Sequence, residues 1–279
     1  MATYQTAKTL YLPSPSYPNT TYAYLKLGHS SSANLPLLYL THFRGTIDKV
    51  DPHLINILSR TRPTAADFLS LLGEKEVDIL GFSMGGFVAQ LLALNADSKV
   101  LKVRKLILGG TTASAGANII PSPNSERVGQ VAGAAEITAQ TFQTLFFHEN
   151  ESGRKACQDW WKRVRERSNG YADGGAGIQA QAAVLSNWSN PEMSQGEDGS
   201  YERLRELDIP VLVANGSDDF IVPTVNSFHI QQRVPNAKLI VYPDSGHGFL
   251  YQYVRSSLGM SRDSWGKCIG EKKVTGEPI

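Results

Sequence analysis

The sequence predicts an α/β fold in which a mainly parallel β-sheet carries helices on both faces. Short, continuous apolar runs, typical of strands buried on both faces, alternate along the chain with segments of helical apolar period. One of these strands runs directly into a helix through a serine flanked by glycines. Strands that alternate with helices are joined by crossover connections, and such connections make neighbouring strands parallel.

The centre of the predicted sheet is a strand at residues 77–80, followed by Gly81-Phe82-Ser83-Met84-Gly85 and then by a helix. A G-x-S-x-G motif between a strand and a helix is typical of a nucleophilic serine. The sharp turn strains its central residue and leaves little room for side chains two positions away, which explains both glycines. We expect Ser83 to stand at the carboxyl end of the strand, beside the free N–H groups of the helix N-terminus.

The segment before this motif is expected to contain three strands and two helices. The alternating and apolar patterns predict the strands, with a proline-rich turn between the first two, at residues 9–12, 21–27 and 35–40. Asp51 is expected to cap a helix that begins at Pro52 and stops at Pro63. Thr64 is expected to begin a second helix, which Gly73 closes.

The segment after the motif is expected to complete the sheet. Apolar runs predict three further strands, the first of them buried, at residues 105–108, 211–214 and 238–242. A helix is expected at residues 223–233. The loop before this helix contains Asp218 and Asp219, and His247 follows the last strand. Because parallel strands end at one edge of the sheet, we expect these side chains to lie near Ser83.

The chain is predicted to divide into a core, residues 1–112 and 203–279, and an insertion of mostly helical character at residues 113–202. Helices are expected at residues 137–147 and 154–165, and a tail without regular structure from about residue 259. The insertion is rich in aromatic residues, of which four are candidate substrate contacts: Phe146, Trp160, Trp161 and Trp188. The alternative is that these residues form the core of the insertion, and two tryptophans at adjacent helical positions cannot face one way.

Composition limits the classes of partner. A formal net charge of +1 gives no indication of a nucleic acid or an anionic membrane. The two cysteines, Cys157 and Cys268, imply neither a disulfide framework nor a four-ligand zinc site. Neither a signal-length apolar run at the start nor a stretch of about 18 apolar residues is present, so a soluble, cytoplasmic protein is expected. We expect no cofactor and no metal, and the oligomeric state stays open.

Serine, aspartate and histidine occur in the order that accompanies G-x-S-x-G. A serine hydroxyl is a poor nucleophile until a base takes its proton, and the base works best when a third group orients it. The motifs resemble those of the α/β-hydrolase family: Gly81 to Gly86, the Gly216 to Pro223 loop, Ser245-Gly246-His247-Gly248-Phe249, and the strand that leads into His42-Phe43-Arg44-Gly45.

The resemblance implies a role for each matched residue. Ser83 would be the nucleophile, His247 the general base and Asp219 the acid that orients it, with Asp218 as the alternative acid; the aspartate that is not used would cap the helix near Pro223. The N–H groups of Met84 and Phe43 would form the oxyanion hole. His42 is expected to shape that loop by hydrogen bonds, and Arg44 is a weaker candidate for binding a substrate anion.

Two departures from the family pattern are expected. The stretch between Arg44 and Glu76 is shorter than the roughly 43 residues that helix, strand and helix with their loops need. The interpretation is that one central strand is absent, which leaves either an unpaired sheet edge or a shifted strand from residues 22–27. The closing amphipathic helix of the family is also predicted to be absent, although residues 249–258 can begin one.

The leading functional hypothesis is hydrolysis of a small-molecule acyl substrate, an ester, thioester or lactone, through an acyl-enzyme. Serine at the turn disfavours the related epoxide hydrolases and dehalogenases, which resemble this chain but use aspartate there. The alternatives are a non-catalytic ligand-binding protein or inactive truncated variant, and perhydrolase, lyase or cofactor-free oxygen chemistry on the same residues.

Overall fold

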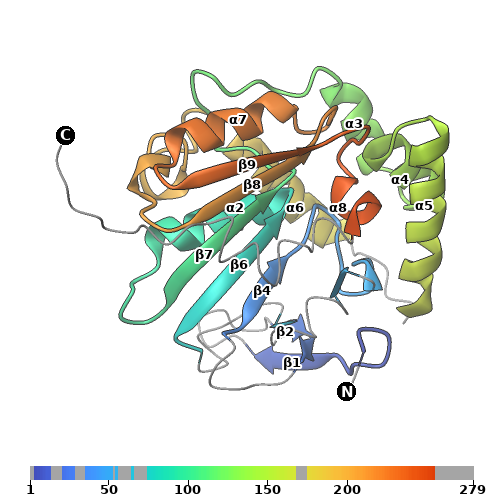
Figure 1. Ribbon diagram of the computed structural model, residues 1–279, viewed down its shortest axis with the longest axis horizontal. Coiled ribbons are helices and arrows are strands. Elements are labelled where there is room, and N and C mark those ends of the chain that lie inside the picture. The colour runs from blue at the N-terminus through green and yellow to red at the C-terminus, as the bar shows by residue number, and fades with distance from the viewer. Residues whose placement is uncertain are drawn as a thin grey trace, which may run out of the picture.

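The computed structural model describes residues 3–13, 21–28, 35–52, 54–55, 64–65, 74–167 and 175–254. Its main sheet has the strand order β3-β5-β4-β6-β7-β8-β9, and a separate two-stranded sheet pairs β1 with β2 (Figure 1). The strands are β1 (Leu10–Pro13), β2 (Thr21–Tyr24), β3 (Lys26–Leu27), β4 (Leu37–Leu40), β5 (Thr64–Ala65), β6 (Glu76–Phe82), β7 (Lys102–Gly109), β8 (Val211–Gly216) and β9 (Ala237–Tyr242).

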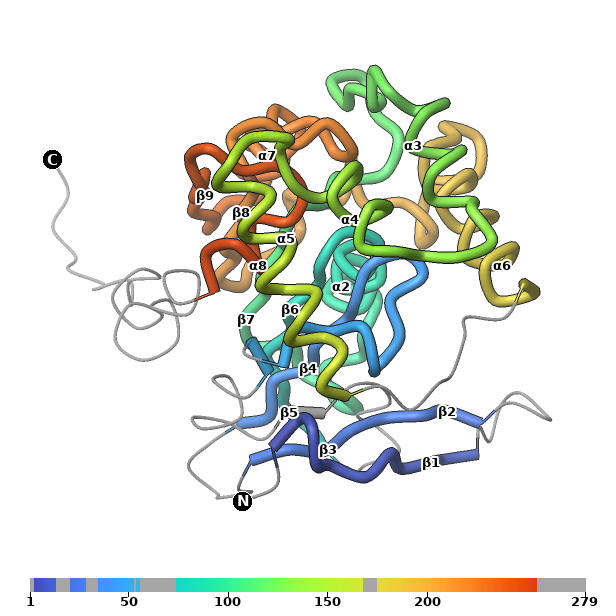
Figure 2. The backbone as a smooth tube through the Cα atoms, turned by 90° about the vertical axis from the view of Figure 1, so that its right-hand side faces the viewer, coloured from blue at the N-terminus to red at the C-terminus, as the bar shows by residue number. Residues whose placement is uncertain are grey.

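The helices cover the sheet and the ends of its strands. They are α2 (Met84–Asn95), α3 (Ser125–Ala132), α4 (Ala139–Phe146), α5 (Glu151–Val164), α6 (Gly175–Trp188), α7 (Thr224–Arg233) and α8 (Phe249–Gln252). Figure 1 shows α3, α4 and α5 on the side of the sheet toward which the strand arrows point. In both views the β1–β2 ribbon lies at the opposite end of the molecule from α3 and α7 (Figures 1 and 2).

The predicted parallel sheet is confirmed. Strand β4 pairs in parallel with β6, β6 with β7, β7 with β8, and β8 with β9. The register aligns Phe82 with Gly109, Gly109 with Ala214, and Gly216 with Tyr242. The loops that follow β6, β7, β8 and β9 therefore leave the sheet at one edge, and this edge carries the candidate site.

Strand β4 shows why an uninterrupted apolar run forms the middle of this sheet. Successive side chains point to opposite faces, so Leu37 and Tyr39 join one buried cluster while Leu38 and Leu40 join another. The four side chains are at most 8% exposed. Both faces of the sheet are thus covered, as the continuous apolar pattern predicts.

The expected loss of one central strand is corrected by the structure. The two-residue strand β5 pairs in parallel with β4 and antiparallel with β3. Residues Thr64 and Ala65 therefore form a strand at a position where a helix start was predicted, and residues 66–73 of that helix lie outside the described residues. The short strand escaped prediction because two residues are too few to show a strand pattern.

The helix predicted from Pro52 is described at residues 52, 54 and 55, and its remainder lies outside the described residues. The Ile55 N–H donates to the carbonyl oxygen of Asp51, as at a helix start. The Asp51 carboxylate has another partner, because it accepts hydrogen bonds from Arg163 of α5 at 2.6 and 3.0 Å. This buried carboxylate ties the segment after β4 to the helical insertion.

The helical insertion, the chain between β7 and β8, contains α3 to α6. Helices α4 and α5 match the predicted segments at residues 137–147 and 154–165. Thr138 and Thr141 form a reciprocal capping box at the start of α4, and Asn150 caps α5 through the N–H of Gly153. Figure 2 shows α5 running along the molecule from the level of α7 toward the β-strands at the other end.

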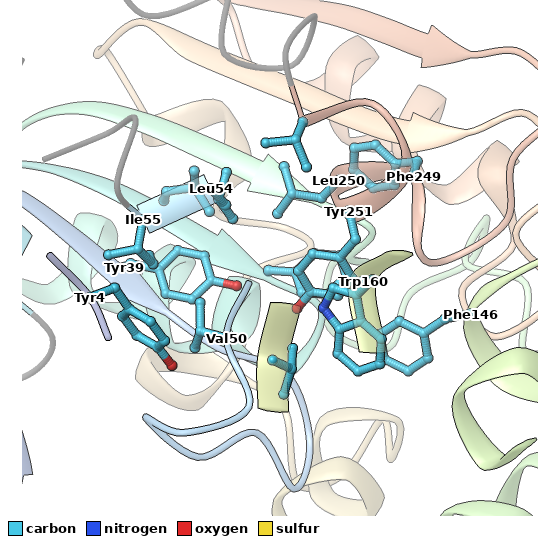
Figure 3. Close-up of a cluster of buried hydrophobic side chains, with 14 of the residues drawn as sticks. Tyr4, Tyr39, Val50, Leu54, Ile55, Phe146, Trp160, Phe249, Leu250 and Tyr251 are labelled. Carbon is cyan, nitrogen blue, oxygen red and sulfur yellow. The ribbon is translucent and has the colours of Figure 1, made fainter. Parts of the chain in front are cut away.

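A cluster of large aromatic side chains joins the insertion to the core. Trp160 of α5 is 0% exposed and stacks on Tyr251 of α8 at a ring-centroid distance of 5.3 Å. Tyr251 also stacks on Phe146 at 6.2 Å. Figure 3 shows the rings of Tyr251, Trp160 and Phe146 together beside Phe249 and Leu250. This packing fixes α4 and α5 against the segment that follows β9.

Helix α8 is four residues long, and the chain beyond residue 254 lies outside the described residues, including the predicted tail from residue 259. In the described part of the chain, no helix has both the length and the apolar character needed to span a bilayer.

Candidate active site

Ser83 occupies the turn between β6 and α2. Its backbone has φ 56° and ψ −123°, a conformation rare for residues other than glycine. The Ser83 N–H donates to the carbonyl oxygen of Gly109 on β7, and the Gly86 N–H donates to the Ser83 carbonyl oxygen. Strain of this kind persists only where neighbouring structure holds it, and it concentrates at functional sites.

The glycines around Ser83 permit close backbone approach. A Cβ atom at Gly81 would lie 2.5 Å from the Gly85 carbonyl oxygen, and one at Gly85 would lie 2.3 Å from the Leu40 carbonyl oxygen. A Cβ at Gly86 would lie 2.4 Å from Thr111 Oγ1. The helix N-terminus is therefore pressed against the end of β4 and the loop after β7, as the G-x-S-x-G pattern requires.

His247 and Asp219 are brought together by the loops after β9 and β8. His247 Nδ1 lies 2.7 Å from Asp219 Oδ2, and both side chains are buried. The other carboxylate oxygen, Oδ1, accepts hydrogen bonds from the N–H groups of Ile221 and Val222 at 2.9 and 3.0 Å. With Oδ1 occupied in this way, the carboxylate is held with Oδ2 toward the imidazole.

Ser83 and His247 line the same cavity. In the described structure the Ser83 and His247 side chains are not joined by a hydrogen bond, so the serine–histidine contact of a catalytic triad is not formed. Catalytic hydrogen bonds are often long before substrate binds. Gly110, with φ 52°, leaves room for the imidazole, since a Cβ there would lie 3.3 Å from His247 Nδ1.

Asp218 lies apart from His247. Its carboxylate is 84% exposed and approaches His148 Nε2 at 3.7 Å. The expectation that the second aspartate caps α7 is wrong, since Pro223 stands at that cap with no side-chain hydrogen bond. His148, to which the sequence assigned nothing, contacts both loops, because its ring also lies 3.5 Å from Asp244 Oδ1.

The two N–H groups predicted to form an oxyanion hole belong to Phe43 and Met84. Phe43 follows β4, and Met84 is the first residue of α2. Neither N–H donates to another residue of the described chain, and Ser83 and Phe43 line one cavity. The contact of Gly85 with Leu40 brings the start of α2 against the loop that holds Phe43.

His42 shapes this loop. Its Nδ1 lies 2.8 Å from the carbonyl oxygen of Phe43, to which it donates. The ring is 3% exposed and is surrounded by aromatic rings, with the ring of Phe146 at 5.2 Å. Burial lowers the pKa of His42 to about 4. His42 is therefore a neutral hydrogen-bond donor over the ordinary pH range.

Arg44, a weak candidate for anion binding, is 4% exposed and has φ 56°. Its Nη1 donates to the carbonyl oxygens of Ala132 and Ala134, at 2.8 and 2.5 Å, where α3 ends. Its backbone N–H donates to Gln181 Oε1 of α6 at 2.7 Å. Arg44 thus joins the oxyanion loop to two helices of the insertion, and the sequence carried no signal for Gln181.

A cavity of about 970 Å³ lies over Ser83 and His247. Its described lining includes Phe146 and Trp188, two of the four aromatic candidates. Trp160 belongs to the buried cluster, and Trp161 lines a separate hollow of about 550 Å³ beside α4 and α5. Among the described residues, no cluster of histidine, cysteine and carboxylate side chains has the arrangement of a metal site.

The chain belongs to the α/β-hydrolase fold family. A family model described as the alpha/beta hydrolase fold matches residues 62–252, which is more than half of the chain. An α/β-hydrolase fold protein from Chitinophaga pinensis has a TM-score of 0.79 and 26% identity, and the match covers 93% of this chain and 98% of that one.

Two curated proteins are similar to parts of the chain. The non-heme haloperoxidase of Rhodococcus erythropolis is 34% identical over 85 residues, which cover 26% of this chain and 31% of that protein. The poly(3-hydroxyalkanoate) depolymerase of Ectopseudomonas oleovorans is 25% identical over 185 residues, 66% of this chain and 59% of that protein. The chain spans less than two thirds of the length of each, and the family supports hydrolase activity at a coarse level.

Proposed function

We propose that this protein is a serine hydrolase that cleaves an ester, thioester or lactone through an acyl-enzyme intermediate. The observation that carries the proposal is the 2.7 Å contact between His247 Nδ1 and Asp219 Oδ2, next to the cavity that Ser83 also lines. A carboxylate at Nδ1 fixes the tautomer that leaves Nε2 free to accept a proton.

In the proposed reaction His247 Nε2 takes the proton of Ser83 Oγ as this oxygen attacks the substrate carbonyl carbon. The N–H groups of Phe43 and Met84 stabilise the negative charge that develops on the carbonyl oxygen. His247 then returns the proton to the leaving alcohol or thiol, and the acyl group stays on Ser83. A water molecule, deprotonated by the same imidazole, releases the acid and regenerates the serine.

The helical insertion, residues 113–202, acts in this proposal as a cap on the core formed by residues 1–112 and 203–279. Its support is that residues of α3, α4 and α6 line the cavity over Ser83. A non-catalytic binding protein would be favoured if the missing strand left the sheet too damaged to align the three residues. The continuous parallel pairing from β4 to β9 argues against such damage, because it keeps the loops of Ser83, Asp219 and His247 at one edge.

The test is hydrolysis of p-nitrophenyl esters by the wild type and by Ser83→Ala. The substitution removes a single oxygen atom from a largely buried side chain, so the thermal transition should stay within a few degrees while turnover falls by about 10⁴-fold or more. A Ser83→Ala variant as active as the wild type would exclude the proposal. Ser217→Ala, a substitution on an exposed loop residue, is the matched control and should retain activity.

A further inference from the structure

Three helices of the insertion present one face each to the cavity over Ser83. Their lining residues recur at the spacing of a single helical face, and they are Ser125, Val128, Gly129 and Ala132 of α3, Thr141, Phe142, Leu145 and Phe146 of α4, and Ile178, Ala182, Leu185 and Trp188 of α6. Most of these side chains are apolar. An amphipathic helix normally covers such a face with other protein, whereas here the faces border open space that a ligand can fill.

The volume of the cavity exceeds the needs of a short acyl group. At about 970 Å³ it could hold roughly thirty water molecules of about 30 Å³ each. This is near the upper end of the range for small-molecule pockets, about 300–1,000 Å³. An acetyl group would occupy a small part of this space and leave the three apolar helix faces in contact with water.

The described lining of the cavity offers little to a charged substrate. Arg44 is the one arginine, lysine, aspartate or glutamate of this described lining. Its Nη1 donates to the carbonyl oxygens of Ala132 and Ala134. Transfer of an ionised group into an apolar cavity without a partner is strongly unfavourable, so the lining favours a neutral substrate.

We propose that the substrate is an uncharged ester whose acyl or alkyl part is a large apolar group, of about six to twelve carbons, held against α3, α4 and α6. The inference rests on the proposed serine hydrolase function and specifies its substrate class. Burial of each methylene is expected to raise kcat/KM by up to about fourfold, the equivalent of about 0.8 kcal/mol.

The first experiment measures kcat/KM along two ester series below their micelle concentrations. In p-nitrophenyl alkanoates the acyl part grows, and in alkyl acetates the alcohol part grows. We expect a rise of about tenfold or more between the two-carbon and eight-carbon members of one series, and the series that rises identifies the part that fills the cavity. Flat profiles in both series, with turnover that still requires Ser83, would overturn this substrate class and leave the hydrolase proposal intact. The absence of Ser83-dependent turnover of every ester would overturn the hydrolase proposal itself.

The second experiment fills the cavity from one helix. Gly129 of α3 lines the cavity, and an added Cβ there meets nothing within 4 Å. Gly177 of α6 is the matched control, since it has the same open surroundings and is not among the lining residues. Both replacements remove a helical glycine, which favours folding. Gly129→Leu should lower kcat/KM for the octanoate about fivefold relative to the acetate, whereas Gly177→Leu should leave this ratio unchanged. An unchanged ratio in Gly129→Leu would contradict the placement of the apolar part of the substrate against α3.

A separate observation concerns the peptide unit between Phe43 and Arg44, which hydrogen bonds hold at both of its polar groups. The Phe43 carbonyl oxygen accepts from His42 Nδ1 at 2.8 Å, and the Arg44 N–H donates to Gln181 Oε1 at 2.7 Å. Arg44 is held at φ 56°, a conformation that costs free energy for a residue other than glycine. The two hydrogen bonds fix the peptide unit next to the N–H of Phe43.

The geometry points to Gln181 as a positioning residue for the oxyanion hole. Through Gln181, the insertion sets the direction of the Phe43 N–H. This inference also rests on the proposed function. Since a misplaced donor stabilises the transition state less while substrate binding is little changed, the loss should appear in kcat.

Gln181→Ala is expected to lower kcat about tenfold or more with KM within about twofold. Gln181→Glu keeps an oxygen acceptor and should restore most of kcat. Gln179→Ala, on an exposed position of the same helix, is the control and should match the wild type. An unchanged kcat in Gln181→Ala, or an equal loss of kcat in Gln181→Glu, would overturn the inference. Wild-type turnover that does not depend on Ser83 would instead overturn the underlying function.

Discussion

Replacement of Asp219 by asparagine tests the geometry of the candidate site in detail. Asp219 Oδ1 accepts the N–H groups of Ile221 and Val222, and Oδ2 accepts from His247 Nδ1. Asparagine has a single oxygen, and the two backbone donors will hold it. Its NH₂ group therefore turns toward His247 Nδ1, which must then be an acceptor. The imidazole proton moves to Nε2, and His247 can no longer take the proton of Ser83.

The expected loss in kcat is about 10⁴-fold, or about 5.5 kcal/mol of transition-state stabilisation, the size seen when a triad acid loses its tautomer control. Stability should change much less. The hydrogen bonds to Ile221 and Val222 persist in the variant, and the lost charge-assisted bond is worth about 1.5–3 kcal/mol. The assay is steady-state turnover of a p-nitrophenyl ester, accompanied by a thermal melt.

Asp218→Asn is the matched control, because its carboxylate is 84% exposed and touches the edge of His148. It should retain turnover within about twofold of the wild type. The reasoning is refuted if Asp219→Asn keeps a tenth or more of the activity, or if Asp218→Asn loses as much as Asp219→Asn does.

Three further outcomes follow from contacts in the structure. Gly86→Ala places a Cβ 2.4 Å from Thr111 Oγ1 and 2.6 Å from Thr111 Cβ. The substitution should therefore lower the free energy of unfolding by about 1–3 kcal/mol. An unchanged urea midpoint would contradict the close approach of Gly86 to Thr111. Arg167→Met removes the guanidinium that pairs with Asp48 at 3.1 Å, where both side chains are largely buried. Urea unfolding should show that the free energy of unfolding falls by about 3–5 kcal/mol. A fall of less than about 1 kcal/mol would contradict a stabilising role for this buried pair. Burial holds the pKa of His42 at about 4 in the folded chain, below the ordinary value of about 6.5, so the unfolded chain binds this proton first. Its contribution to stability is complete above about pH 6.5 and should fall by about 3 kcal/mol as the pH drops to about 4; His42→Gln should lack this part of the slope, and parallel stability–pH curves for the two proteins would refute the assignment.

The parts of the fold that the sequence predicts well are those in which local pattern and burial agree. Strand β4 and residues 211–214 of β8 are unbroken apolar runs, and the structure buries both of their faces, so the pattern was sufficient. Strand β6 was predicted although its run contains the buried Asp78, which pairs with Arg104. The turn at Ser83 was predictable for a different reason. An added Cβ would lie 2.5 Å from a backbone carbonyl oxygen at Gly81 and 2.3 Å from one at Gly85, and a sequence pattern records such a requirement for glycine directly.

The parts that escaped prediction depend on tertiary contacts. Strand β5 exists because β4 and β3 offer hydrogen-bonding partners on either side, and Thr64 alone resembles a helix start after proline. Gln181 contacts the loop after β4, and His148 contacts the loops after β8 and β9. Both come from the insertion, whose helices could not be oriented beforehand. Helix α6 shows why: it is apolar around most of its circumference, so its sequence contains little information about which face meets Arg44.

The most direct test of the central claim is the reaction of the intact protein with a fluorophosphonate probe, followed by peptide mass spectrometry. A serine becomes reactive toward this probe only when a neighbouring base removes its proton. The account predicts one probe per chain on Ser83, no labelling of Ser83→Ala, and strongly slowed labelling of Asp219→Asn. A wild-type protein that stays unlabelled, or that is labelled equally in Ser83→Ala, would contradict it.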